Sequence, residues 1–314
     1  MRLTEAVQDY VVLKQSMGSR FRTEATILKA FCKASGDVAI TEVKPQQVAS
    51  YLAGRGPVTR YWHRKFEALS GFYRFALGRG YVAYSPLPTT IPKRPQPFRP
   101  YIFTEEELRR LFKAAGEFGS PRTALSGATL RPLLVLLYGA GLRISEALAL
   151  TLGDVDLGAS VLTIRQSKFY KTRVVPTGPH LTAVLSTYAD DRRRWSHSSH
   201  HTSPFFVTRT GAAVTRGMAE CAFVRVRHMA GVAREEGARY QPRLHDLRHT
   251  MAVHRLLAWY HEGADVQRLL PQLATYLGHV DVAATQRYLT MTPVLLRQAA
   301  SRFEQYAQME VDHE

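Results

Sequence analysis

Two histidines, two arginines and a tyrosine in this sequence have the types and spacing needed to handle a phosphate. His245 and Arg248 lie three residues apart, so on a helix both project from one face and can reach the same phosphate. A second basic pair, Arg143 and His279, could complete a cationic cup around the phenol of Tyr288. The set suggests attack of a tyrosine on a phosphodiester.

The chemistry of a phosphodiester explains why such a tyrosine needs cations. The charge of the diester repels nucleophiles, and the five-coordinate transition state concentrates more negative charge on the non-bridging oxygens. Arginine suits this role best, because its planar fork binds two phosphate oxygens and stays charged. An isolated tyrosine with a pKa of about 10 is a poor nucleophile, so a base or cationic surroundings must assist it.

The order and spacing of these residues resemble those of the tyrosine recombinase (integrase) family, whose pattern is Arg, Lys, His-x-x-Arg, His or Trp, then Tyr. The segment 141–146 looks like the first signature of that family, Gly-Leu-Arg-x-Ser-Glu, and Tyr288 follows His279 at the family's distance. The resemblance implies that Arg143 and Arg248 bind the phosphate. It also implies that Tyr288 is the nucleophile, which leaves a covalent 3′-phosphotyrosine and a free 5′-hydroxyl.

A lysine between two predicted strands completes the resemblance. Lys168 lies in the segment 167–176, which is similar to the family's hairpin lysine followed by Lys-x-Arg-x-Val-Pro. The family's chemistry makes this lysine the general acid for the 5′-oxygen leaving group. Many members flank it with glycines, whereas this chain has Ser167 and Phe169, so Lys171 remains an alternative.

The sequence also suggests roles for the other polar residues near these positions. His245 could shuttle the proton of Tyr288 or support the phosphate, and His279 could bond a non-bridging oxygen. Glu146 lies one helical turn after Arg143 and could orient its guanidinium or cap the local backbone. Two further histidines of this region are interpreted as structural: His249 and His254.

The charge of the chain points to a polyanionic partner. Its 42 Lys and Arg residues against 26 acidic residues give a formal net charge of +16. Nucleic acid is a better partner than an acidic membrane surface, because no Lys/Arg-rich amphipathic anchor stands out. The family resemblance implies that this nucleic acid is double-stranded DNA. The two cysteines, Cys32 and Cys221, are far apart, which favours a reducing compartment and argues against a zinc site. Neither a GxxxxGK[ST] loop nor an acidic two-metal set occurs, so we expect no metal and no cofactor.

Nothing in the sequence suggests a membrane or secretion. The first 15 residues contain charged side chains and no apolar core of a signal peptide. The longest apolar run, at residues 133–142, is far shorter than the roughly 20 residues that span a bilayer. We therefore expect a cytoplasmic, soluble protein.

The elements that must position these residues fall into two predicted domains. Apolar residues recur at helical spacing in four stretches of residues 3–82, which predicts four helices in a DNA-binding domain at 1–84. Pro45 suits the first turn of the third helix. One face of the fourth is basic and is interpreted as contacting the DNA backbone: Arg60, Arg64, Lys65, Arg74 and Arg79. Residues 85–100 hold six prolines among basic residues, which predicts an extended linker.

Residues 101–314 are predicted to form the catalytic domain. Thr104 and Glu107 have the spacing of a capping box, which predicts the start of a helix. Apolar helical stretches are expected at 129–148, 214–232 and 293–308, with an extension of a loop or helix at 259–271. Alternating residues predict strands at 161–165 and 172–176, with an earlier short strand near 150–152. Residues 190–204 are interpreted as a flexible basic loop, with a metal site through His197, His200 and His201 as the weaker alternative.

These observations predict a mainly α-helical fold with a small antiparallel sheet in the second domain. The family resemblance implies that the two domains form a C-shaped clamp on DNA. The resemblance implies a site-specific DNA recombinase that cleaves and rejoins strands without metal or ATP. It also implies a homotetramer, or a hetero-assembly with related recombinases, on two DNA sites, in which the tail from Pro293 docks on a neighbouring subunit. The alternatives are a type IB topoisomerase and a DNA-binding protein with a degenerate site.

Overall fold

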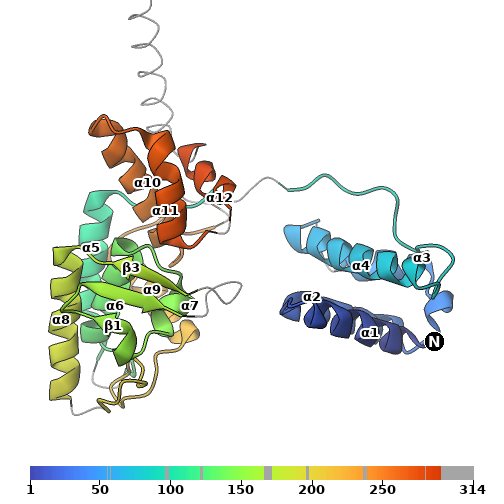
Figure 1. Ribbon diagram of the computed structural model, residues 1–314, viewed down its shortest axis with the longest axis horizontal. Coiled ribbons are helices and arrows are strands. Elements are labelled where there is room, and N and C mark those ends of the chain that lie inside the picture. The colour runs from blue at the N-terminus through green and yellow to red at the C-terminus, as the bar shows by residue number, and fades with distance from the viewer. Residues whose placement is uncertain are drawn as a thin grey trace, which may run out of the picture. The chain divides into compact units, whose positions relative to one another are not determined.

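The computed structural model describes the chain in segments: residues 1–54, 56, 58–95, 99–120, 123–165, 172–195, 198–235, 238, 240–279 and 281–290. The chain forms two compact units, Met1–Phe98 and Arg99–Glu314, which are described separately below (Figure 1). Three predictions fall outside the described residues, namely the two candidate lysines, Lys168 and Lys171, and the helix at 293–308.

The first unit contains the four helices that the apolar periodicity predicts. They are α1 (Leu3–Ser16), α2 (Arg22–Ser35), α3 (Pro45–Ala53) and α4 (Arg60–Gly78). A short 3-10 turn, Ile40–Glu42, joins α2 to α3, and α4 packs against the other three helices. The core between them is aromatic and apolar, and includes Leu28, Phe31, Leu69, Phe72 and Tyr73. Pro45 is the first residue of α3, where its missing N–H costs no helical hydrogen bond.

The second unit is mainly helical. Its helices are α5 (Glu105–Gly116), α6 (Gly127–Gly139), α7 (Ile144–Leu148), α8 (Pro179–Arg194), α9 (Arg216–Met229), α10 (Asp246–His261), α11 (Val266–Leu277) and α12 (Ala283–Gln286), followed by the 3-10 turn η4 (Arg287–Thr290). The apolar α6 packs against α5, α8 and α10. Figure 1 shows α10, α11 and α12 together at one end of this unit.

Local sequence signals set the start of α5. The Thr104 hydroxyl accepts a hydrogen bond from the Glu107 amide at 3.2 Å, and the Glu107 carboxylate accepts one from the Thr104 amide at 2.8 Å. This is the predicted capping box, which satisfies two backbone donors that the first helical turn leaves without partners.

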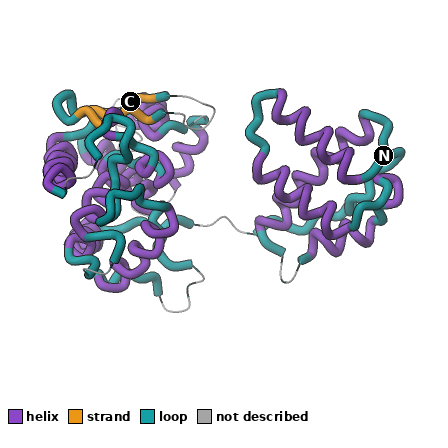
Figure 2. The backbone as a smooth tube through the Cα atoms, turned by 90° about the horizontal axis from the view of Figure 1, so that it is seen from below, coloured by secondary structure: helices purple, strands orange, loops and turns teal. Residues whose placement is uncertain are grey.

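A three-stranded antiparallel sheet lies at one edge of the second unit (Figure 2). Its strands are β1 (Val155–Asp156), β2 (Val161–Ile164) and β3 (Arg173–Pro176), in the order β1-β2-β3. Leu162 and Val175 face each other across the β2–β3 ladder and are both buried. The sheet and the surrounding helices confirm the predicted fold class.

The strand expected near 150–152 lies outside the sheet, because Thr151 forms an isolated antiparallel bridge with Pro204. Leu152–Asp154 form a 3-10 turn, and the first strand begins at Val155. The Asp154 carboxylate accepts hydrogen bonds from the Thr151 amide and hydroxyl at 3.0 and 2.7 Å. These bonds hold the short turn that leads from Thr151 into β1.

The interpretation of residues 190–204 as a loop was wrong for its first part. Arg192, Arg193 and Arg194 form the last turn of α8, and Arg192 is buried, with its guanidinium donating to the Pro204 carbonyl at 3.0 Å. The ring centroids of His200 and His201 lie 4.4 Å apart, while His197 falls outside the described residues. Among the described residues no group of His, Cys, Asp and Glu side chains is arranged to hold a metal.

The expected extension between Arg248 and His279 is helical. It lengthens α10 to His261. The side chain of Asp265 then caps the start of α11, because it accepts a hydrogen bond from the Arg268 amide at 3.1 Å. None of the helices in the described part of the chain is long and apolar enough to cross a bilayer.

The contact between α5 and α6 yields a test of packing. A Cβ added at Gly127 would lie 2.2 Å from the Gly116 carbonyl oxygen, whereas one added at Gly217, in α9, meets nothing within 4 Å. We expect Gly127→Ala to lower the free energy of unfolding by about 1–3 kcal/mol through overpacking. Gly217→Ala should leave it unchanged or raise it by up to about 1 kcal/mol. Urea unfolding of both variants checks this, and equal effects would contradict the packing argument.

Candidate active site

The first turn of α10 carries His245, Arg248 and His249. Asp246 is fully buried and accepts hydrogen bonds from the Arg243 amide at 2.9 Å and the Arg243 guanidinium at 3.0 Å. These bonds fix the start of the helix, and with it the direction of the side chains that follow.

Arg248 is an almost fully buried cation. Its guanidinium donates to the Gly141 carbonyl at 2.6 Å and to the Leu277 carbonyl at 2.7 Å, and the residue is 2% exposed. Gly141 belongs to the turn before α7, and Leu277 is the last residue of α11. One side chain therefore joins three segments that are distant in the sequence.

Arg143 precedes α7 and is held by Glu146. The Glu146 carboxylate accepts hydrogen bonds from the Arg143 amide at 3.0 Å and from its guanidinium at 2.6 Å. Both predicted contacts of Glu146 are thus confirmed: its carboxylate caps the backbone and also orients the guanidinium. Arg143 also donates to the Gly278 carbonyl at 3.1 Å, and about a third of its side chain remains exposed.

A second arginine, Arg173 in β3, shares the same carboxylate. Its guanidinium makes two bonds to Glu146, at 3.1 and 2.9 Å, and a third to the Tyr276 carbonyl at 3.2 Å. Burial alone would raise the pKa of Glu146, but Arg173 and Arg143 together lower it to about 2. Arg173 is the arginine of the Lys-x-Arg-x-Val-Pro pattern, but the sequence alone suggested no role for this residue.

Gly278 ends α11 and sets the position of His279. Its φ of +67° is left-handed, and a Cβ there would lie 2.6 Å from the Nη1 of Arg173, so the position requires glycine. The following His279 places its Nδ1 2.7 Å from the Thr285 hydroxyl. This bond connects the end of α11 to α12, directly before Tyr288.

Tyr288 lies in η4 and is 2% exposed. Its hydroxyl is 3.2 Å from the Nδ1 of His249, and the two ring centroids are 5.6 Å apart. The His279 ring lies nearly parallel to the phenol at a centroid distance of 6.1 Å. The structural interpretation of His249 missed this contact with the tyrosine, and only its place directly after Arg248 could have suggested it.

The electrostatics of the site favour neutral rings around the phenol. Burial is the main cause that lowers the pKa of His249 to about 3 and that of His279 to about 4, and the charges of nearby basic residues lower both further. Desolvation and the charge of Arg248 lower the pKa of His245 to about 4, although part of this side chain faces solvent. Burial raises the pKa of Tyr288, while Arg248 and Arg143 oppose that effect.

Five of the six predicted site residues therefore lie in one region of the second unit. Arg143 and Arg248 both contact the turn that ends α11, His279 follows that turn, and Tyr288 lies beside His279. His245 packs edge-on against His249, with ring centroids 4.8 Å apart. The sixth, Lys168, and its alternative, Lys171, belong to the segment between β2 and β3 that lies outside the described residues.

Comparison with known proteins gives consistent results. A profile described as the Phage integrase family matches residues 102–293. The chain is 36% identical over 306 residues to the putative integrase/recombinase y4rB of Sinorhizobium fredii, covering 96% of each chain. It is 31% identical over 282 residues to the tyrosine recombinase XerC of Chlorobaculum tepidum, covering 85% of this chain and 75% of the relative.

Solved structures show the same fold at lower identity. The Tn1549 transposon integrase in complex with transposon right end DNA superposes with a TM-score of 0.72 at 14% identity, covering 98% of this chain and all of that one. A lambda integrase tetramer bound to a Holliday junction gives a TM-score of 0.66 at 17% identity, covering 92% of this chain and 77% of that one.

The histidine pKa values predict how stability depends on pH. The unfolded chain protonates its histidines near pH 6.5, whereas folded His249 and His279 resist protonation down to about pH 3 and pH 4. Between these limits the unfolded state binds more protons, so the free energy of unfolding should fall as the pH is lowered from about 7 to about 4.5. The stabilising effect of the low pKa of Glu146 is lost only at lower pH.

Urea unfolding at several pH values measures this slope. The variant His249→Gln should flatten it, because one neutral ring is removed, whereas His261→Gln, at an exposed position, should not. An unchanged slope in His249→Gln would contradict the low pKa of this ring.

Proposed function

Because this chain belongs to the phage integrase family, whose tyrosine recombinases cleave and exchange DNA strands, we propose that Tyr288 is its nucleophile. One observation carries this proposal: the Tyr288 phenol lies between the His249 and His279 rings, next to the buried charge of Arg248. Fifteen tyrosines occur in the chain, and Tyr288 is the one placed in these surroundings within the described residues.

Each neighbour of Tyr288 has a role in the proposed reaction. Arg143 and Arg248 neutralise the non-bridging oxygens, and Arg143 keeps the exposed surface needed to meet an incoming phosphate. His279 donates a hydrogen bond to one of these oxygens through Nε2, since its Nδ1 is engaged with Thr285. His245 supports the same phosphate from the start of α10.

The proposed reaction has two transfers that mirror each other. The phenolate of Tyr288 forms a bond to phosphorus, and the bond from phosphorus to the 5′-oxygen breaks, which leaves a 3′-phosphotyrosine. The departing oxygen takes a proton from Lys168, with Lys171 as the alternative donor. A 5′-hydroxyl from another strand then reverses the step, so the ester bond is conserved and no ATP or metal is required.

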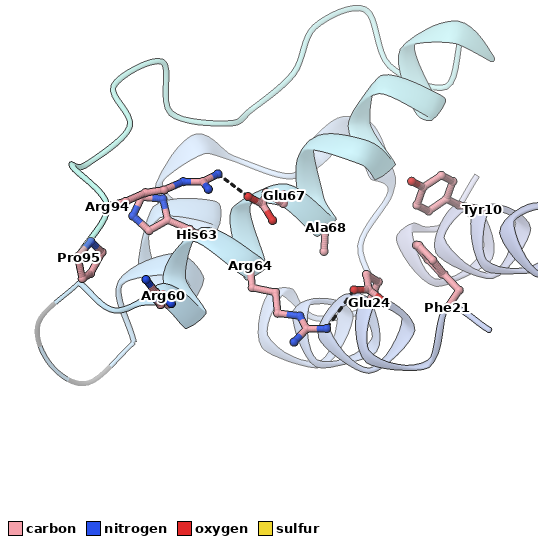
Figure 3. A pocket seen from close by; sticks show the side chains of 10 residues that line it. All are labelled: Tyr10, Phe21, Glu24, Arg60, His63, Arg64, Glu67, Ala68, Arg94 and Pro95. Carbon is pink, nitrogen blue, oxygen red and sulfur yellow. Dashed lines mark hydrogen bonds and ion pairs between the residues drawn. The ribbon is translucent and has the colours of Figure 1, made fainter. Parts of the chain in front are cut away.

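The first unit offers a cationic cleft for the DNA backbone. A cleft of about 740 Å³ runs along α4 and is lined by Arg60, His63, Arg64 and Arg94 (Figure 3). Arg94 pairs with Glu67 at 2.6 Å, and Arg64 pairs with Glu24 at 3.4 Å. Both pairs are exposed, so a phosphate can replace the carboxylates at little cost. The buried Nε2 of His63 has no hydrogen-bond partner within the described residues.

The assembly on DNA follows from the same family membership. We infer that four copies act on two DNA sites, or that copies combine with related recombinases. An apolar groove of about 710 Å³ in the second unit, lined in part by Val135, Leu181, Trp259 and Leu273, is a suitable acceptor for the tail after Pro293 of a neighbouring copy. The expected location is the cytoplasm.

The same residues would fit two other functions, each of which predicts different reaction products on DNA. A type IB topoisomerase would relax supercoiled DNA as a monomer and would not exchange strands between two sites. A DNA-binding protein with a degenerate site would form no covalent adduct. Exchange between two duplexes carrying the target sites distinguishes the recombinase from both.

The covalent intermediate tests the proposed nucleophile directly. Purified protein is incubated with nicked duplexes carrying candidate sites from the DNA that flanks the gene, and adducts that survive denaturant are measured. We expect the wild type to form an adduct attached at the 3′-phosphate and Tyr288→Phe to form none while binding DNA equally well. The matched variant Tyr276→Phe, at a tyrosine whose hydroxyl donates to the Pro176 carbonyl, should retain the adduct. An adduct in Tyr288→Phe would disprove the assignment.

DNA affinity at varied salt tests the cleft of the first unit. Arg60→Ala and Arg64→Ala should each weaken binding and lower the slope of log affinity against log salt by about 0.9, because each loses one phosphate contact. Arg2→Ala is the control, since Arg2 is an exposed arginine that pairs with Asp37 and does not line the cleft. Equal slopes in all three variants would place the DNA elsewhere.

A further inference from the structure

The hydrogen bond between His249 and Tyr288 is the contact that joins the proposed nucleophile to a titratable ring. An imidazole nitrogen donates or accepts according to its proton, and the Nδ1 of His249 lies 3.2 Å from the Tyr288 hydroxyl. Burial, together with the charges of Arg248 and Arg243, disfavours a positive charge on this ring. A neutral ring with its proton on Nε2 leaves Nδ1 free to accept from the phenol, and this is the tautomer that the proposal below requires.

The other neighbours of this hydroxyl are less suited to take its proton. Arg248 lies beside the phenol, but a guanidinium has no acceptor. The Nδ1 of His279 is engaged by the Thr285 hydroxyl, and its ring lies parallel to the phenol, which leaves its nitrogens aimed away from the oxygen. His245 contacts the edge of the His249 ring and makes no hydrogen bond to Tyr288 within the described residues.

We propose that His249 is the general base that accepts the phenolic proton of Tyr288 as the phenol attacks the phosphodiester. The proton passes from the tyrosine oxygen to Nδ1, the oxygen forms its bond to phosphorus, and the electrons of the breaking bond go to the 5′-oxygen. In the reverse step the imidazolium returns the proton to the departing phenol. This inference rests on Tyr288 being the nucleophile.

The negative charge of the substrate makes this transfer favourable. In the free protein, burial and the charge of Arg248 oppose a charge on His249, whereas a bound phosphodiester neutralises the arginines and favours the imidazolium. The base thus becomes effective when DNA occupies the site. Because His249 follows Arg248 in the same helical turn, the phosphate ligand and the base are held by one rigid element.

Substitutions of His249 test the proposal on the nicked duplexes described above. His249→Gln keeps a hydrogen-bond acceptor but cannot take a proton, so the rate of adduct formation should fall by about 10² or more, with unchanged DNA affinity. The matched control is His254→Gln in the same helix, whose Nδ1 lies 2.9 Å from the hydroxyl of another tyrosine, Tyr138. It should keep a rate close to that of the wild type.

The pH profile separates a base from a structural residue. The loss in His249→Gln should shrink as the pH rises, because hydroxide and the ionised phenol replace the missing base. A loss that is equal at all pH values would overturn the proposal and leave His249 a positioning role. A duplex with sulfur in place of the 5′-oxygen has a leaving group that needs no proton, so it should not restore the variant. Restoration would identify His249 as an acid instead.

A measurement on the free protein tests the direction of the hydrogen bond without DNA. Nitrogen NMR of histidine-labelled protein, with the His249→Gln variant to assign the signal, should show His249 neutral with its proton on Nε2. A proton on Nδ1 would overturn the proposal. If the tautomer is as expected but Tyr288→Phe still forms an adduct, the proposed nucleophile is at fault rather than the inference about its hydrogen bond.

Discussion

The second unit depends on the buried guanidinium of Arg248. It donates to the carbonyls of Gly141 and Leu277, which belong to segments 107 and 29 residues away in the chain. A buried cation without such partners would cost several kcal/mol, so the turn before α7 and the end of α11 must both stay at hydrogen-bonding distance. The requirement places Arg143, which follows the first turn, and His279, which follows the second, beside the same helix. The proposed phosphate site is thereby held in place by the fold itself.

Glu146 organises the outer side of this site. A single carboxylate bonds two guanidinium groups, those of Arg143 and Arg173, and both arginines reach carbonyls at the end of α11. The glycine at 278 lets Arg173 approach the backbone closely enough to close this network. Since Arg173 belongs to β3, the network also connects the sheet, and the strand that follows the candidate lysines, to the position of His279. A carboxylate shared by two arginines orients them and offsets their repulsion, so both can stand near one phosphate.

The tyrosine is kept in a reactive but protonated form. Its burial opposes ionisation, the arginines favour it, and the Nδ1 of His249 lies 3.2 Å from its hydroxyl. This balance suits an enzyme of this family, because a free phenolate would be repelled by the DNA charge until the arginines are in place. The uneven charge of the whole chain, +16, serves a different purpose, since it attracts DNA over long distances and says nothing about which residues react.

The sequence alone determined the helices of the first unit, the capping box at Thr104, the apolar α6 and the mainly helical class with a small sheet, because these follow from periodicity and short-range hydrogen bonds. It also selected the residues of the site through their types and order. Only the tertiary structure decided which distant side chains contact each other. Tyr288 shares a hydrogen bond with a histidine 39 residues away, and Arg173 donates one to a glutamate 27 residues away. Periodicity identifies which face of a helix is buried, but it does not specify the distant side chain that lies opposite. His249 and Arg173 were missed for that physical reason, and so was the burial of Arg192. The short strand expected near 150–152 pairs with Pro204 instead of joining the sheet, and that partner is also distant in the sequence.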